Sequence, residues 1–280
     1  MSDRWDVVVD TSEKKGFINL KQIWHYKDLL ILLVRRDFVA FYKQTILGPI
    51  WFFIKPIVSS IVYFFIFGQV AGISTDGLPP ALFYISGLIL WGFFTDIVNN
   101  CGNVFIINAP IFGKVYFPRL IMPISIVFSS LLKLIVQLLL LFLIYSYFLF
   151  ITEELTISFN IFLVPLVILF VSLQALGLGI LVAAMATKYR DFYMLLGYVL
   201  QIGLFLTPVV FPFSTLTGKF KVLISFNPMT YPVELFRIAF FGTGTITTNG
   251  ILYSIGVTFI ILFVGLNAFN KAEKTFVDLI

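Results

Sequence analysis

Residues 121–149 read IMPISIVFSSLLKLIVQLLLLFLIYSYFL, an apolar run that contains one charged side chain, that of Lys133. A bilayer hydrocarbon core about 30 Å thick is crossed by roughly 20 helical residues. This run therefore predicts a membrane-spanning helix. Five more runs of similar length and character follow the same rule, near residues 50–71, 81–101, 160–186, 192–213 and 250–269. The sequence thus predicts an all-α membrane protein with six transmembrane helices.

The composition fits a chain surrounded by lipid. Of the 280 residues, 60% are hydrophobic and 12% are charged, and the mean hydropathy is +1.02. Soluble domains carry about a quarter charged residues, so cytosolic enzymes, nucleic-acid readers and secreted disulfide scaffolds are excluded. Cys101 is the one cysteine and His25 the one histidine. We therefore expect no internal disulfide and no metal site of clustered histidines or cysteines.

The distribution of Lys and Arg predicts the orientation of the chain. Eight of these residues precede residue 50, two follow each of the second and fourth predicted spans, and two lie at the C-terminus, whereas three lie between the fifth and sixth spans. Basic residues gather in cytoplasmic loops, so fourteen against three predicts that both termini are cytoplasmic. The net charge of +5 is then an orientation signal, and we expect neither a nucleic-acid partner nor a cleavable signal peptide.

Two segments outside the spans are predicted on the cytoplasmic side. After a polar tail over residues 1–18, residues 19–49 contain an amphipathic helix that suits the membrane interface, either as a lipid anchor or as a docking surface. Residues 102–120 predict short helices broken by Pro110 and Pro118. They form either a contact surface or a loop packed on its own helices.

A third segment, residues 214–249, is apolar but is divided by proline and glycine into pieces too short to cross the membrane. It predicts two short helices on the outer side, either re-entrant helices that form a gate or helices lying on the outer leaflet. Residues 50–280 as a whole form the predicted transmembrane domain.

Three ionisable residues fall inside predicted spans. A charge at the bilayer centre costs about 2.5–3.5 kcal/mol on insertion scales, so each needs an explanation. Lys55 and Asp96 lie near span ends, from which their side chains reach the interface. Lys133 lies about 18 Å along its helix at 1.5 Å per residue. We expect it to line a transport path or to pair with Asp96.

Motifs for ATP hydrolysis and for transferase chemistry are absent from the sequence. In the two Gly-Lys pairs, 113–114 and 218–219, the position of the first P-loop glycine is occupied by Asn108 and Phe213. No Asp cluster exists that would hold Mg²⁺ and a diphosphate. We therefore expect no enzyme activity in this chain and an energy source on a partner.

Eight short strings resemble the membrane subunits of ABC-type polysaccharide exporters, the permeases that export O-antigen, teichoic acid and similar lipid-linked glycans. In order, they are RDF at 36–38, YKQTILGPIW at 42–51, KP at 55–56, KVYFPRLI at 114–121, YRDF at 189–192, TPV at 207–209, NPM at 227–229 and FR at 236–237. Lys133 departs from this family, in which a neutral or acidic residue is expected at that position.

The resemblance implies a homodimer in a bacterial inner membrane, completed by two copies of a cytoplasmic ATPase that uses ATP and Mg²⁺, with no cofactor on this chain. The substrate would be a polysaccharide linked to polyprenyl diphosphate. The interface helix and the loop after the second span would contact the ATPase through Arg36, Tyr42, Lys43, Lys114, Tyr116 and Arg119. The outer helices would form a gate with Asn227, Pro228, Tyr231, Glu234 and Arg237.

Aromatic residues are 18% of the chain, and a glycan path explains part of this excess. An aromatic face holds the apolar face of a sugar weakly, which suits a polymer that must slide. Candidate channel residues within spans are Tyr63, Phe64, Tyr84, Lys133, Tyr198 and Phe205. Contact with lipid is the alternative explanation for such aromatics. Alternatives for the function are a permease of the same architecture for a drug or a lipid, and a membrane-embedded glycosyl- or phosphotransferase.

Overall fold

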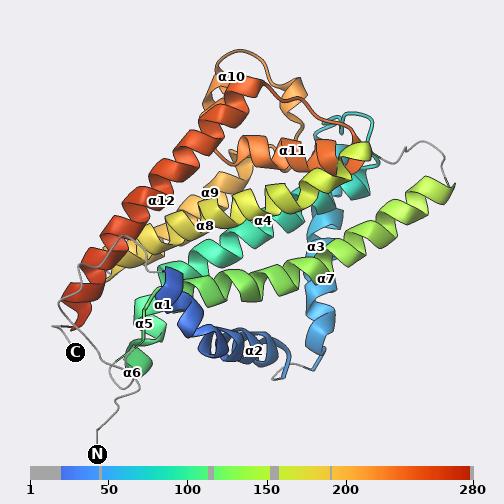
Figure 1. Ribbon diagram of the computed structural model, residues 1–280. Coiled ribbons are helices and arrows are strands. Elements are labelled where there is room, and N and C mark those ends of the chain that lie inside the picture. The colour runs from blue at the N-terminus through green and yellow to red at the C-terminus, as the bar shows by residue number, and fades with distance from the viewer. Residues whose placement is uncertain (1–19, 44–45, 113–116, 152–157, 190, 278–280) are drawn as a thin grey trace, which may run out of the picture.

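The computed structural model describes residues 20–43, 46–112, 117–151, 158–189 and 191–277, and the regular structure in these ranges is helical. Four long helices form the body of the bundle (Figure 1): α4 (Pro80–Gly102), α7 (Ile121–Ile151), α8 (Val164–Ala186) and α12 (Thr248–Val277). The short helices α5 (Val104–Ile107) and α6 (Ala109–Phe112) lie at one end of the bundle. Helices α10 (Gly218–Ser225) and α11 (Thr230–Phe241) lie at the other.

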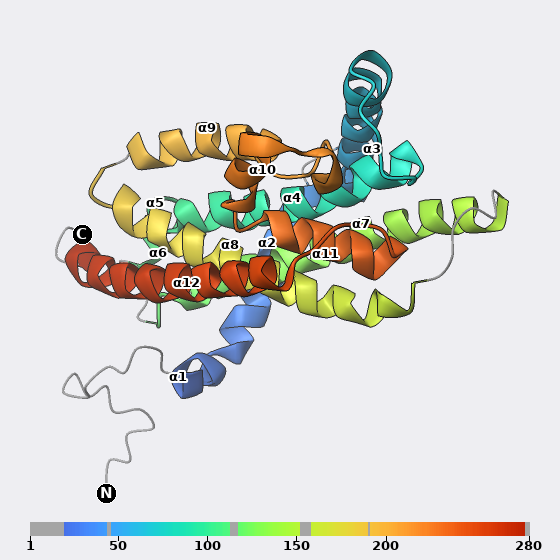
Figure 2. The same ribbon diagram turned by 90° about the horizontal axis from the view of Figure 1, so that it is seen from above.

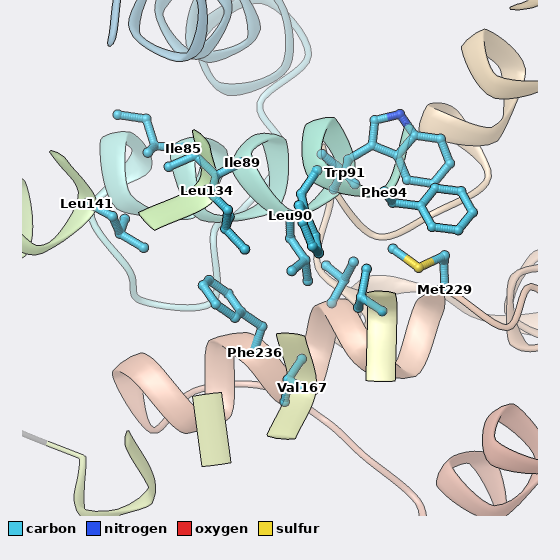
Figure 3. Close-up of a cluster of buried hydrophobic side chains, with 14 of the residues drawn as sticks. Ile85, Ile89, Leu90, Trp91, Phe94, Leu134, Leu141, Val167, Met229 and Phe236 are labelled. Atoms are coloured by element: carbon cyan, nitrogen blue, oxygen red, sulfur yellow. The ribbon is translucent and has the colours of Figure 1, made fainter. Parts of the chain in front are cut away.

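Helix α4 is the centre of the bundle. Of its membrane-length stretch, 72% is buried inside the protein, compared with 17% for the stretches that contain α3 (Trp51–Tyr63) and α12. A helix that is apolar on every face is covered by protein, by lipid or by both. Figure 3 shows α4 side chains such as Ile89 and Leu90 meeting Leu134 of α7 and Phe236 of α11 in one hydrophobic core. The elements around α4 therefore share its core.

Helices α8 and α12 approach each other at a pair of glycines. A Cβ atom on Gly265 would lie 2.5 Å from the Gly177 carbonyl oxygen, and one on Gly177 would lie 3.0 Å from the Leu262 backbone nitrogen. Small residues permit such close backbone approach in membrane helices. This crossing holds α12 against α8.

Five of the six predicted spans are helices long and apolar enough to cross a membrane, in the ranges that the structure describes. They are Gly48–Val70, Pro80–Gly102, Ile121–Phe150, Phe159–Ala186 and Thr248–Glu273. The first combines η1 (Gly48–Ile50), α3 and the π-helix η2 (Phe64–Val70), and the fourth begins with η3 (Phe159–Leu163). Figure 2 shows α3 at the edge of the bundle.

The remaining run, predicted as a helix over 192–213, is helical only as α9 (Asp191–Phe205). At 1.5 Å per residue its 15 residues extend about 22 Å, less than the hydrocarbon core. The predicted helix end was wrong, because Pro208 disfavours helical backbone at Thr207 and brings no N–H to continue the ladder. A six-span topology stays a prediction.

The segment predicted as an amphipathic interface helix is helical, as α1 (Leu20–His25) and α2 (Lys27–Lys43), and its place at the membrane interface stays a prediction. Leu33 of α2 is 3% exposed and packs into a second hydrophobic cluster with residues of α5, α6 and α12, whereas Trp24 and Ile31 are exposed. The outer segment contains the two short helices predicted there, α10 and α11, preceded by the 3₁₀ turn η4 (Phe213–Thr215). Their placement relative to a membrane stays a prediction.

Candidate functional site

Helix α11 carries a buried ion pair at the end of the bundle formed by α10 and α11. Arg237 Nη1 lies 3.2 Å from Glu234 Oε1, and both side chains are 2% exposed. The two residues are one helical turn apart, so both project from the same face of α11 toward the bundle. Burial raises the pKa of the Glu234 carboxyl and lowers that of the Arg237 guanidinium, and the attraction between the two charges opposes both pKa shifts.

Arg237 also binds the irregular segment that follows α9. Its Nη1 donates to the Pro208 carbonyl at 2.6 Å and its Nη2 to the Val209 carbonyl at 3.0 Å. Carbonyl groups beyond a helix end have no helical partner, and an unpaired one is costly inside a membrane protein. The guanidinium therefore donates hydrogen bonds to backbone carbonyls that lie beyond the end of α9. In this way one side chain joins α11 to the end of α9.

Helix α4 forms the third side of this site. The Arg237 guanidinium carbon lies 3.8 Å from the centre of the Phe83 ring, a cation–π contact. A Cβ atom on Gly87 would lie 2.9 Å from Arg237 Nη2 and 3.1 Å from the Val209 carbonyl oxygen. Gly87 thus leaves the space that the guanidinium fills. The sequence prediction named Glu234 and Arg237 but missed Phe83 and Gly87, which no local motif marks.

Asn227, in the turn between α10 and α11, holds the same irregular segment from the other side. Its Nδ2 donates to the Leu206 carbonyl at 2.8 Å and to Thr207 Oγ1 at 2.7 Å, while its Oδ1 accepts from the Met229 N–H at 3.0 Å. The neighbouring Pro228 carbonyl accepts from Ser254 Oγ of α12 at 2.6 Å. The turn therefore joins α9 and α12.

Tyr231 completes the set of outer-gate candidates. It is 7% exposed, lies against Gly250 of α12, where a Cβ atom would clash with its ring, and makes an edge contact with Phe213 at 6.3 Å. All five candidates thus lie on the α10–α11 hairpin or its turn, and together they attach it to α4, α9 and α12. Their role in gating stays a prediction.

The channel candidates do not form one ring within a single chain. Tyr84 is fully buried, Tyr63 and Phe64 are half-buried on α3 and η2, and Tyr198 and Phe205 of α9 are exposed. Phe67, which the prediction missed, connects two of these groups, with ring centres 5.8 Å from Tyr63 and 6.3 Å from Phe205. The aromatic contacts therefore run from α3 through η2 to α9.

Lys133 of α7 forms an ion pair that joins two of the membrane-length helices. Its Nζ lies 3.0 Å from Asp96 Oδ2 of α4, and Ser130 Oγ donates to the same oxygen at 2.6 Å. The Lys133 and Asp96 side chains are 19% and 33% exposed. The pairing of Lys133 with Asp96, one of two alternatives from the sequence, is confirmed.

The candidates for ATPase contact have different surroundings. Arg36 is 43% exposed and pairs with Asp37 at 2.8 Å, and Lys43 is exposed at the end of α2. Arg119 is buried, donates to the Glu273 carbonyl of α12 at 2.8 Å and lies over the Phe112 ring. It thus holds the α6–α7 connection to α12. Lys114, Tyr116 and the side chain of Tyr42 lie outside the described residues.

These features define a multi-pass α-helical membrane protein with a buried or partly buried ion pair at each of two sites. The chain belongs to the ABC-2 type transporter membrane family, whose model matches residues 28–241. This range extends from the start of α2 to the end of α11, so it contains the Asp96–Lys133 and Glu234–Arg237 ion pairs and every described candidate residue.

Individual relatives align with almost the whole chain. The O-antigen export system permease protein RfbA of Klebsiella pneumoniae is 26% identical over 254 residues, which are 90% of this chain and 95% of the relative. Its counterpart in Myxococcus xanthus is 25% identical over 262 residues, 92% and 98% of the two chains. The capsule polysaccharide export inner-membrane protein CtrC of Neisseria meningitidis is 20% identical over 258 residues, 91% and 95%. The chain is therefore a homologue of polysaccharide export permeases.

Proposed function

We propose that this chain is the membrane-spanning subunit of an ATP-driven exporter that moves a polysaccharide linked to polyprenyl diphosphate out of the bacterial cytoplasm. The observation that carries this proposal is the alignment with O-antigen and capsule export permeases over at least 90% of this chain and 95% of theirs. Alignment end to end means that the spans, the connections and the outer hairpin all have counterparts in the relatives.

The proposed working unit is a homodimer whose two copies enclose the path. A single chain leaves the apolar and aromatic faces of α3, η2 and α9 uncovered, with Ile61, Phe65, Tyr198 and Ile202 each about half exposed or more. These three elements also carry four of the six channel candidates. A second copy placed against them would enclose Tyr63, Phe64, Tyr198 and Phe205 between the protomers, where they would offer weak stacking sites to a sliding glycan.

The energy source is assigned to a separate cytoplasmic ATPase, which would hold ATP and Mg²⁺ while this chain binds no cofactor. We place its contact at the end of the bundle formed by α2, α5 and α6, with both termini on the cytoplasmic side of the inner membrane. Leu33 of α2 and Phe112 of α6 share one hydrophobic cluster with Phe269 of α12. A push on α2 or α6 would therefore reach α12 directly.

At the opposite end, α10 and α11 would close the path toward the outside as re-entrant helices. The segment 206–212 would complete the crossing that α9 begins, since Arg237 and Asn227 bind its carbonyls and make irregular backbone tolerable within the membrane. Opening the gate would then require α11 to move together with the end of α9.

The proposal is tested by co-expression with a candidate ABC ATPase subunit from the same organism in a strain that lacks its own O-antigen exporter. We expect the ATPase to co-purify and glycan to reach the cell surface only when both subunits are present. A Walker-lysine variant of the ATPase is the matched control and should assemble without export. Export of a drug or a phospholipid in proteoliposomes, with no glycan at the cell surface, would contradict the glycan substrate and favour a permease for a drug or a lipid.

A further inference from the structure

The structure contains a polar cavity that the proposed transport path does not use. It has a volume of about 340 Å³ and lies between α2, the ends of α4 and α5, and the first half of α7. Its polar lining includes Arg36 and Asp37 of α2, Asn100, Asn108, Ser129 and Lys133. The Lys133 ammonium, held by Asp96, forms part of its wall. Charged and hydroxyl groups of α2 and α7 thus line one space with the amides of Asn100 and Asn108.

One polar group in this cavity has no partner. Ser129 is 3% exposed, and its Oγ makes no hydrogen bond with any residue that the structure describes. The neighbouring Ser125 and Ser130 hydroxyls donate to the Met122 carbonyl and to Asp96. A buried hydroxyl without a partner is unfavourable, so a group that enters the cavity and accepts from Ser129 would be stabilised there.

A second hollow adjoins the first and shares Arg36 and Ala40 with it. Its volume is about 450 Å³, and it follows α2 past Leu32, Val39, Arg35 and Lys43. Apolar and basic side chains of α2 therefore line a shallow hollow beside the polar cavity. Within the cavity, Arg36 pairs with Asp37 and Lys133 with Asp96, so the excess of positive charge comes from Arg35 and Lys43 of the second hollow. The excess of positive charge favours an anionic ligand.

The length of α7 places this cavity near the edge of the hydrocarbon core. Its membrane-length stretch, Ile121–Phe150, has 30 residues, about 45 Å at 1.5 Å per residue, which exceeds the core by about 15 Å. The polar residues Ser125, Ser129, Ser130 and Lys133 all lie in the first half, which also exposes the apolar residues Phe128 and Leu132. Because the charged and hydroxyl groups gather there, we place the excess length at the α2 end, at the depth of the lipid headgroups.

From these observations we infer that the cavity between α2, α4 and α7 binds the phosphate-bearing headgroup of a membrane lipid. The phosphate oxygens accept from the Arg36 guanidinium and Ser129 Oγ, with the Lys133 ammonium beside them, and the hydrocarbon chains lie along Leu32 and Val39. Charge-assisted bonds from a planar guanidinium suit a phosphate. Two lipids offer this chemistry, an anionic phospholipid and a polyprenyl phosphate carrier.

The test uses the full-length permease alone, stripped of lipid in detergent and titrated with single lipids under native mass spectrometry. The probes are phosphatidylglycerol, diacylglycerol with the same acyl chains, and polyprenyl phosphate. We expect a phosphate-bearing lipid to bind at least tenfold more tightly than diacylglycerol. Tighter binding of phosphatidylglycerol assigns the site to membrane phospholipid, and tighter binding of polyprenyl phosphate assigns it to the glycan carrier. Equal binding of all three would overturn the inference.

Two substitutions connect the binding to these residues. Arg36→Gln should weaken binding of the preferred lipid about tenfold, and Ser129→Ala about threefold to tenfold. Lys188→Gln, which removes an exposed cation outside the cavity, is the matched control and should change nothing. Ser129→Ala should also raise the unfolding temperature of the lipid-free protein, because it removes an unpaired hydroxyl. If both cavity variants bind like the wild type while remaining folded, the site does not exist. Since no ATPase is present, this failure would leave the transport proposal untouched.

Discussion

Two ion pairs of this membrane protein, Glu234–Arg237 and Asp96–Lys133, differ in how far the surrounding protein buries them. At the end formed by α10 and α11, Arg237 and Glu234 are each 2% exposed, and the guanidinium binds two backbone carbonyls in addition to the carboxylate. Between α4 and α7, Lys133 and Asp96 are partly exposed and lie at a cavity that contains an unpaired hydroxyl. The first pair completes the fold, whereas the second leaves room for a ligand.

The largest effect is expected from Arg237→Met, which removes the guanidinium from the Pro208 and Val209 carbonyls and from the Glu234 carboxylate, which keeps the Thr245 N–H as a donor. Breaking a buried pair by removing one partner costs roughly 3–5 kcal/mol, a large fraction of the stability of a typical domain. We expect a severe loss of folded protein, measured as the monodisperse fraction in detergent and as the unfolding temperature.

The double variant Arg237→Met with Glu234→Gln is the control for this prediction. It removes the unpaired charge, so it should recover part of the lost stability but not the part contributed by the bonds to the irregular segment. A single variant as stable as the wild type would show that the guanidinium does not hold α9, α4 and α11 together.

The next effect in size is expected from Gly87→Ala, which tests the geometry of the first pair without changing its charge. The added methyl group would lie 2.9 Å from Arg237 Nη2 and 3.1 Å from the Val209 carbonyl oxygen. Crowding of this kind costs about 1–3 kcal/mol, to be measured by thermal unfolding. Gly92→Ala in the same helix, where a Cβ atom would meet nothing within 4 Å, is the matched control and should be neutral or slightly stabilising.

The hydropathy of the chain was sufficient to predict the five membrane-length helices, because each is an apolar run whose length the bilayer determines. It placed the end of α9 eight residues too late, although Pro208 marks the correct end. The partners of Arg237 were out of reach, since the Phe83 ring and the Val209 carbonyl come from positions 154 and 28 residues away. No spacing rule relates such distant positions, and the same is true of Gly177 and Gly265.

The second ion pair was partly predictable. Lys133 inside an apolar run demands a partner, and Asp96 was the one carboxylate available within a predicted span. The spacing of Ser125, Ser129, Ser130 and Lys133 also shows a polar face at helical periodicity, a signal that the sequence prediction did not use. Arg36 and Asn100 lie opposite this face. Their positions depend on how α2 and α4 pack against α7, which the local sequence pattern does not determine.

A smaller effect is expected from Lys133→Met, the counterpart of Arg237→Met in the second pair. Water in the cavity can solvate the remaining Asp96 carboxylate, and an accessible pair contributes less than a fully buried one. We expect a loss of about 1 kcal/mol in thermal unfolding, with near-complete recovery in the double variant Lys133→Met with Asp96→Asn. A loss as large as that of Arg237→Met would mean that the two sites are equally closed, and the comparison would fail.

The smallest change in stability is expected from cysteine substitutions that probe access to the two sites. Cys101 is the one cysteine of the chain and is fully buried, and burial of this kind keeps a thiol unreactive. Asn100→Cys places a thiol on the wall of the cavity, whereas Thr230→Cys places one at a position with no exposed surface beside the α10–α11 turn. A membrane-impermeant charged thiol reagent should modify the first thiol within minutes in inside-out vesicles and the second only after unfolding.

Phosphatidylglycerol or polyprenyl phosphate, whichever lipid fills the cavity, should slow the first reaction and leave the second unchanged. Equal rates of modification at the two positions would mean that the two sites are equally accessible. The contrast between a site that completes the fold and a site that receives a ligand would then fail.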